Sequence, residues 1–122
     1  MTTLLPVLRP GVYAFCALPP DRAVDFPVVG TFREDEGPTV IVEEAVASAH
    51  GLDVVFRAAW VTLGVNSDLY AVGLTAMVAR ALADAGIACN VVAAVRHDHL
   101  FVPAGRGEEV VAMLERLSEP EA

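Results

Sequence analysis

Two histidines flank an aspartate in residues 97–99, a composition found in metal sites and in acid–base catalysis. If this segment is extended, His97 and His99 point to one face and Asp98 to the other, so the three side chains do not converge without a turn. Two histidines alone make an incomplete zinc site. We therefore interpret the segment as a polar hairpin that borders a cleft or an interface. A metal site and an acid–base role are the alternatives.

A second polar segment, residues 66–73, begins with Asn66, Ser67 and Asp68 and directly precedes a predicted helix. The first turn of a helix offers free N–H groups and the positive end of its dipole, which suit a carboxylate or a phosphate. The segment is therefore the main candidate for ligand contact. The alternative is capping alone, because asparagine, serine and aspartate are all good N-cap residues.

Asn90 is a polar residue inside an otherwise apolar run, residues 87–95. If it is buried, leaving its amide unpaired would cost about 1 to 3 kcal/mol, so it needs a partner. That partner is either a bound ligand or a protein group, such as a neighbouring backbone edge or the turn at Asn66. The sequence leaves both readings open.

The remaining polar and aromatic features favour structural roles. Residues 33–36 are typical of a solvated turn, although Arg33 can pair with a ligand carboxylate in bidentate geometry. Trp60 is expected in the core or an interface rather than as a stacking platform. The sequence has no glycine-rich phosphate loop, nucleophile elbow or paired-carboxylate signature, so we expect no catalytic residues, no enzyme activity, no metal and no cofactor.

The composition of the 122 residues predicts one compact domain, or two very small ones sharing a core. With 55% hydrophobic and 20% charged residues, we expect some apolar surface to be shared with another subunit. The formal net charge of -8 argues against nucleic acid and anionic membranes as partners. Cys16 and Cys89 lie in apolar runs and are expected to be core thiols. No apolar run approaches the roughly 20 residues of a membrane span, so we expect a cytoplasmic protein.

The first half of the chain reads as short strands and one helix. We predict an edge strand or arm over residues 4–8, where Pro6 interrupts the run, and a buried strand over residues 11–18. Residues 21–27 are expected to be a loop or one irregular turn. Two more strands follow at residues 28–33 and 39–42, and then a helix that starts at Glu43 and Glu44, runs to His50 and stops at Gly51.

The second half is predicted as strand, helix, strand, strand and helix. Residues 53–65 exceed the usual strand length of about 5 to 6, so we expect a bend near residues 57–59, at which two strands meet. Further predictions are a strand over 87–95 that is apolar on both faces, a turn over 96–98, its partner strand over 100–102, and a helix over 107–117. A further helix is predicted between the runs at 53–65 and 87–95. It carries a buried stripe of Leu74, Met77, Val78, Ala81, Leu82 and Ala85. Because the first half can be laid over this order, the chain reads as a degenerate tandem repeat.

Residues 60–103 resemble an ACT domain of the aspartokinase type. The likeness covers most of the chain and is carried by PGVYAFC, TFREDEG, the stretch from WVTLGVNSD to GIACNVVAAV, and HDHLFVP. It implies an α+β, ferredoxin-like fold of two tandem ACT-like βαββαβ halves, with an antiparallel sheet and helices on one face. The implied halves are residues 1–56 and 57–122, with the strand at 4–8 exchanged into the second. One departure is that many amino-acid-binding ACT loops carry glycine directly after the first strand, whereas here Gly73 already lies at the helix.

The resemblance implies a non-catalytic, regulatory protein that binds a small molecule, expected to be an amino acid, at the junction between ACT units. It also implies side-by-side pairing of such units, and we expect a homodimer. The alternative is a ligand-free module for oligomerisation or protein interaction. The residues expected to bind the ligand are Asn66, Ser67, Asp68, Leu69, Val72, Gly73, Leu74, Asn90 and Val91.

Overall fold

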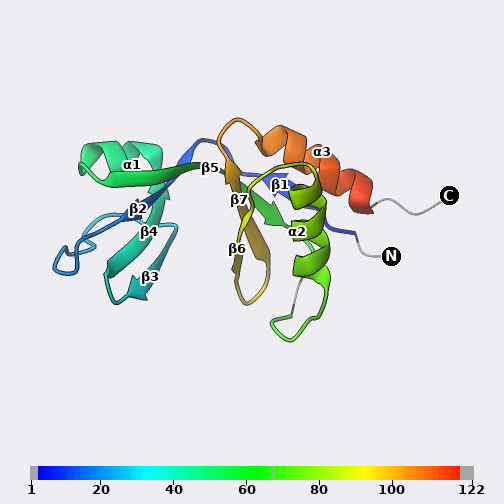
Figure 1. Cartoon of the computed structure of the whole chain (residues 1–122), viewed down its shortest axis with the longest axis horizontal. Coiled ribbons are helices and arrows are strands. Elements are labelled where there is room, and N and C mark those ends of the chain that lie inside the picture. The colour runs from blue at the N-terminus through cyan, green and yellow to red at the C-terminus, as the bar shows by residue number, and fades with distance from the viewer. Residues whose placement is uncertain (1–2, 67, 119–122) are drawn as a thin grey trace. The chain divides into compact units, whose positions relative to one another are not determined.

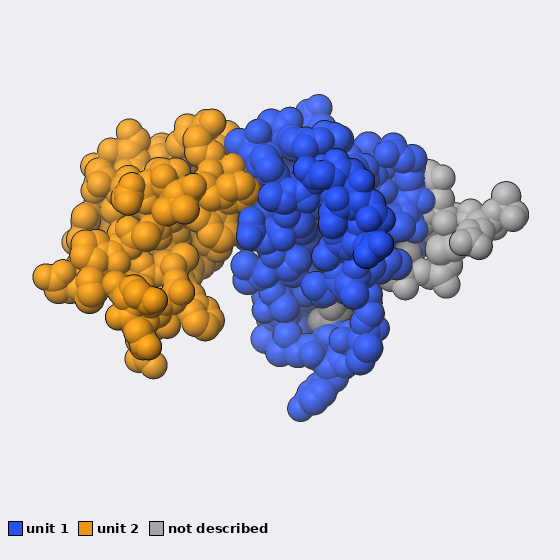
Figure 2. Space-filling view, in the orientation of Figure 1, with its two compact units in different colours: residues 1–10, 59–122 blue, residues 11–58 orange. Residues whose placement is uncertain are grey.

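The computed structural model describes residues 3–66 and 68–118 and divides the chain into two compact units. Unit 1 contains residues 1–10 and 59–122, and unit 2 contains residues 11–58 (Figure 2). The boundary lies inside the strand β5 (Asp53–Leu63), so the two parts of this strand belong to different units. Each unit has a hydrophobic core of its own.

Unit 2 is an antiparallel sheet with one short helix packed on it (Figure 1). The strands follow the order β3-β4-β2-β5, and the helix contacts β2 and β4. Alternate side chains of the strands point to the helix, which is how one face of the sheet becomes the core. The elements are β2 (Tyr13–Ala17), β3 (Gly30–Glu34), β4 (Gly37–Glu43) and α1 (Glu44–Ala49). The core consists of Ala14, Cys16, Leu18, Phe26, Val40, Val42 and Ala47.

The predicted elements of unit 2 are confirmed. Residues 11–18 contain β2, which pairs on one side with β4 and on the other with β5. Residues 21–27 contain no helix or strand. The helix α1 begins directly after Glu43 and has Glu44 in its first turn, where a carboxylate favours the positive end of the helix dipole.

Unit 1 contains the other strands and the two longer helices (Figure 1). β1 pairs with the second part of β5, with Pro6 opposite Leu63, and β6 and β7 form an antiparallel hairpin. β7 lies between β5 and β6 in the sheet. Among the described residues, no helix has both the length and the apolar character that a membrane span requires. The elements are β1 (Pro6–Leu8), α2 (Leu74–Asp84), β6 (Asn90–Ala93), β7 (Asp98–Pro103) and α3 (Gly107–Ser118).

The two helices of unit 1 lie on one face of its sheet, as predicted. The core contains alternate residues of β5 from Ala59 onward and of β7 from Leu100 onward, since side chains two apart on a strand point to the same face. The core positions of α2 are Val78 and Leu82, and those of α3 are Val110 and Leu114. The full core is Leu4, Ala59, Val61, Leu63, Val78, Leu82, Ile87, Leu100, Val102, Val110 and Leu114.

Two predictions for the strands of unit 1 are wrong. β5 is one continuous strand of 11 residues rather than two strands, although its partner changes from β2, which pairs as far as Ala58, to β1, which pairs from Val61. The run predicted over residues 87–95 shrinks to β6 (Asn90–Ala93), which is mostly exposed. β6 ends the sheet order, so one of its edges has no neighbouring strand among the residues that the structure describes.

The two cysteines are free thiols in different surroundings. Cys16 is buried in the core of unit 2, as predicted, whereas Cys89 is only partly buried beside the core of unit 1. Burial raises the pKa of both thiols, and the negative charge of Asp53 adds to the effect at Cys16. Both residues therefore favour the neutral thiol form.

Candidate functional site

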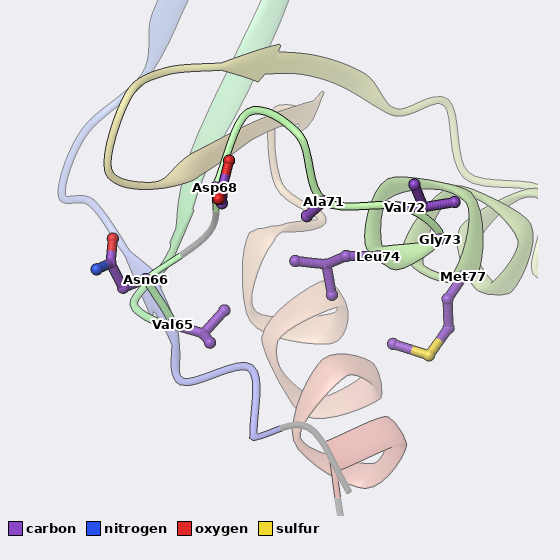
Figure 3. Close-up of a pocket in the computed structure, with 8 residues that line it drawn as sticks. All are labelled: Val65, Asn66, Asp68, Ala71, Val72, Gly73, Leu74 and Met77. Atoms are coloured by element: carbon purple, nitrogen blue, oxygen red, sulfur yellow. The ribbon is translucent and has the colours of Figure 1, made fainter.

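A cavity of about 450 Å³ lies in unit 1 between the end of β5 and the start of α2. A volume of this order fits a small molecule. Val65 and Asn66 lie on one side of the cavity, and Leu74 and Met77 project from α2 on the other (Figure 3). The lining is Val65, Asn66, Asp68, Ala71, Val72, Gly73, Leu74 and Met77.

Backbone hydrogen bonds fix the first part of the segment that lines this cavity. Beyond the last residue of β5, the N–H groups of Gly64 and Val65 donate to the carbonyl oxygens of Leu5 and Leu4, over 2.8 Å and 3.2 Å. Further along, the side chain of Asp68 accepts the N–H of Tyr70 at 2.7 Å. The chain therefore turns at Asp68 by a local side-chain contact of the kind that aspartate often forms.

The helix α2 begins without a side-chain cap. Its N-cap residue is Gly73, which has a left-handed φ of 100°, and no side-chain hydrogen bond caps the helix. A residue with a Cβ would be strained there, which explains the glycine at this position. The alternative of capping by Asn66 or Asp68 is therefore wrong, and Ser67 lies outside the described residues. Within residues 3–66 and 68–118, no side chain caps the first turn of α2, so its N–H groups can bind water or a ligand.

A smaller cavity, of about 60 Å³, lies between the same loop and the β6–β7 hairpin. Asp98 lines it and is only 5% exposed. Leu69, predicted as a ligand contact, lines this cavity rather than the larger one. The full lining is Asp68, Leu69, Ala71, Leu74, Thr75, Ala93 and Asp98.

The two histidines of residues 97–99 are bound to different partners. Nδ1 of His97 lies 3.2 Å from the carbonyl oxygen of Val65, whereas Nδ1 of His99 lies 3.1 Å from Nε1 of Trp60 and 3.1 Å from Oγ1 of Thr62. Residues 97–99 thus do not converge. Within residues 3–66 and 68–118, no group of three or more His, Cys, Asp or Glu side chains is placed to hold a metal ion.

The contacts of His99 belong to an aromatic cluster on the sheet face opposite the helices. Trp60 stacks on Phe101 with ring centroids 5.8 Å apart, and the guanidinium carbon of Arg9 lies 5.2 Å from the Trp60 ring. Nε of Arg9 also donates to Oγ1 of Thr62 at 3.0 Å. Trp60 therefore packs within the fold of unit 1, in agreement with its predicted structural role.

His99 should make the stability of the protein depend on pH. Burial lowers its pKa below the ordinary value of 6.5, Arg9 and His97 lower it further, and Asp98 opposes them. The unfolded chain then takes up the proton first, so the contribution of neutral His99 is complete above pH 6.5 and is lost as the pH falls through the folded-state pKa. We expect the unfolding free energy to fall between pH 7.5 and 5, by less in His99→Gln than in the parent. Urea titrations at several pH values measure this, and equal falls in both proteins would contradict it.

Asn90 does not have the position that its sequence context suggested. Its side chain is exposed on β6, and Nδ2 donates weakly to the carbonyl oxygen of Phe101 at 3.4 Å. Of the two partners that the sequence left open, the amide thus has a protein group, the backbone edge of β7. The residue is exposed because β6 is short and lies at the end of the sheet order. Val91 is partly buried against the core of unit 1. Neither residue lines either of the two cavities described above.

The structure brings most of the predicted loop residues together and adds others. Asn66, Asp68, Val72, Gly73 and Leu74 all line the larger cavity. Sequence reasoning missed Val65, Ala71 and Met77, which line it too. The spacing of Met77, three residues after Leu74 on one helix face, was the signal for it, but that spacing was assigned to the core. In unit 2, residues 33–36 are exposed, as the solvated-turn interpretation predicts.

Comparison with known proteins gives a family and several structures. The sequence matches the ACT domain family twice, over residues 1–59 and over residues 55–116. A crystal structure of a protein of unknown function from Vibrio cholerae, described as a possible transport protein, is 37% identical with a TM-score of 0.83; the alignment covers 92% of this chain and 87% of that one. No curated protein matches the chain.

Two aspartate kinase structures are also similar in fold. The first, of aspartokinase alpha and beta subunits, is 12% identical with a TM-score of 0.69, over 94% of this chain and 97% of that one. The second, the regulatory subunit of aspartate kinase from Thermus flavus, is 13% identical with a TM-score of 0.63, over 93% and 97% of the two chains. At such low identity these two structures show similarity of fold alone.

Proposed function

Since the chain belongs to the ACT domain family, we propose that it is a regulatory protein that binds an amino acid in the larger cavity and catalyses no reaction. Family membership supports the broader role of regulatory ligand binding. The choice of an amino acid rests on the chemistry of the cavity lining. Such a ligand changes the behaviour of a partner only as far as it binds two states of the protein with different affinity.

The observation that carries the proposal is the cavity at the uncapped end of α2. The N–H groups of the first helical turn hold the carboxylate of the amino acid, because they lack a side-chain cap and lie at the positive end of the helix dipole. Asn66 and Asp68 flank the opening with an amide and a carboxylate, groups that can orient an ammonium. Val65, Val72 and Met77 supply apolar contacts for the ligand side chain.

The remaining residues of the expected set have a secondary place in the proposal. Leu69 shapes the smaller cavity under the loop. Asn90 and Val91 lie on β6, the last strand of the sheet order, so they take part only where a second copy of the chain pairs beside this strand. We propose a homodimer of that kind. The exposed side chain of Val92 on the same strand supports it.

We also propose that the protein works as two halves, residues 1–56 and 57–122, with the strand at residues 4–8 exchanged into the second. The division of the compact units between residues 58 and 59 supports this boundary. The pairing of β1 with the second part of β5 supports the exchange, since β1 then completes the sheet of unit 1.

A thermal-shift screen with the twenty amino acids, added singly, tests the binding proposal. A ligand that binds only the folded state adds about 2.7 kcal/mol of stability at a hundredfold excess over its dissociation constant. We expect one amino acid, or a few related ones, to raise the melting temperature in proportion to the logarithm of concentration. If none does, the alternative of a ligand-free interaction module is favoured.

A pair of variants locates the binding. Ala71→Asp places a negative charge in a residue that lines both cavities, so it should remove the shift caused by an amino acid, whose carboxylate it repels. Ala23→Asp adds the same charge to an exposed loop of unit 2 and should leave the shift unchanged. Equal shifts in both variants would place the ligand elsewhere.

A further inference from the structure

His97 and His99 are held in different tautomers by their hydrogen-bond partners. A carbonyl oxygen only accepts hydrogen bonds, so Nδ1 of His97 must carry the proton that it donates to Val65. An indole N–H only donates, so Nδ1 of His99 must be unprotonated to accept from Trp60. Protonation of the whole ring would break the contact of His99 and would leave that of His97 intact. The two side chains therefore have separate roles.

Val65 is anchored from two directions. Its N–H donates to the carbonyl oxygen of Leu4, which precedes β1, and its carbonyl oxygen accepts from His97, which precedes β7. Val65 lines the larger cavity, and the next residue, Asn66, is exposed. The contact with His97 is therefore a side-chain anchor at the point where the backbone leaves the sheet and enters residues 66–73, the ligand loop.

Of the two residues that follow His97, one is bonded to the sheet and the other borders a cavity beside the loop. His99 bonds to Trp60 and Thr62 on β5, and Asp98 lines the smaller cavity together with Asp68 and Leu69 of the loop. His99 thus fixes this segment to β5, and Asp98 borders a cavity that the loop also lines. Because His99 fixes this segment to β5, the Nδ1–H of His97 can restrict the position of the carbonyl group of Val65.

We propose that His97 is a positioning residue for the ligand loop: its Nδ1–H holds the carbonyl of Val65 and so sets the shape of the larger cavity. The inference that this contact affects amino-acid binding rests on the proposed function. The inference that it restrains the conformation of the loop does not. The proposal gives residues 97–99 a role that is neither metal binding nor acid–base catalysis.

Hydrogen exchange of the ligand-free protein, read by mass spectrometry over residues 64–73, tests the anchor. In His97→Leu, which lacks the hydrogen bond, the amide hydrogens of this segment should exchange about fivefold faster. This factor corresponds to the usual net contribution of one hydrogen bond to stability. His97→Asn should restore near-parental exchange, because its side-chain N–H can occupy a position close to that of Nδ1. His50→Leu, which removes an exposed histidine of unit 2, should leave the segment unchanged.

The same proteins are then heated with and without an equimolar mixture of the twenty L-amino acids. The shift should be smaller in His97→Leu than in the parent and should recover in His97→Asn. Parental exchange rates in His97→Leu would overturn the proposal. If His97→Leu does not fold, His97→Ala is used in its place. Faster exchange in His97→Leu, with no response of the parent to the mixture, would support the anchor and refute the proposed function.

Discussion

Gly37→Ala should destabilise unit 2 by about 3 kcal/mol or more. Gly37 has φ of 136°, a conformation that costs residues with a side chain on the order of 1 to 3 kcal/mol. A Cβ at this position would lie 2.0 Å from the carbonyl oxygen of Leu18 and 3.0 Å from the carbonyl carbon of Pro19. These are backbone atoms, so the clash can be relieved only by moving the end of β2 away from β4. That movement would also strain the hydrogen bond from the N–H of Leu18 to the carbonyl oxygen of Pro38, which measures 2.9 Å.

Gly30→Ala is the matched control for this prediction. Gly30 lies on β3 in the same hairpin, and a Cβ there would meet only the side chain of Ile41 at 3.8 Å, an ordinary contact. We expect its unfolding free energy to stay within about 0.5 kcal/mol of the parent. Urea unfolding followed by circular dichroism compares the two variants. The steric explanation fails if both unfold at the same urea concentration.

The fold was predictable because most of its elements repeat a simple pattern. In α2, apolar residues recur every three or four positions, and the structure buries Val78 and Leu82 while leaving Met77 and Ala85 exposed. The pattern therefore located the helix and its inner side but overestimated the width of the buried stripe. The width of the buried stripe is set by packing in the core of unit 1, which brings together residues far apart in the sequence.

The exposure of Asn90 has a related physical cause. A run of apolar residues indicates a strand, but it does not tell whether the strand has neighbours on both edges. Val92 and Val95 are exposed in this chain, so the apolar character of the run does not come from a buried position here. Side-by-side pairing with a second copy, as proposed above, would explain why these exposed residues are apolar.

The candidate site was predictable in position and less so in detail. Polar residues before a helix indicated the correct segment, but the same residues suggested capping, and the structure uses Gly73 as the N-cap residue instead. The spacing of Met77 places it on the same side of α2 as Leu74, but whether a residue there faces the core or the cavity depends on how α2 docks on the sheet. No spacing singles out Val65. The link from His97 to Val65 joins positions 32 residues apart and has no local signal.

Leu82→Ala should cost about 2 to 5 kcal/mol of stability, the range measured for leucine truncations in protein cores. Leu82 is 0% exposed and packs in the core of unit 1 on α2, the helix whose first turn lines the larger cavity. The loss combines the transfer free energy of the removed methyl groups with that of the cavity they leave. Because Leu82 lines neither cavity, the folded variant should still respond to the mixture of twenty L-amino acids.

Leu69→Ala makes the same chemical change with the opposite expected outcome. Leu69 is 63% exposed, so its truncation should change the unfolding free energy by no more than about 0.5 kcal/mol. It lines the smaller cavity, however, and the loop that it supports carries the proposed ligand contacts, so the thermal shift caused by the mixture should shrink. Urea titration and the thermal-shift assay on both variants separate folding from binding. A parental shift in Leu69→Ala would exclude the smaller cavity from the site, and a loss of stability equal to that of Leu82→Ala would show that the loop belongs to the core.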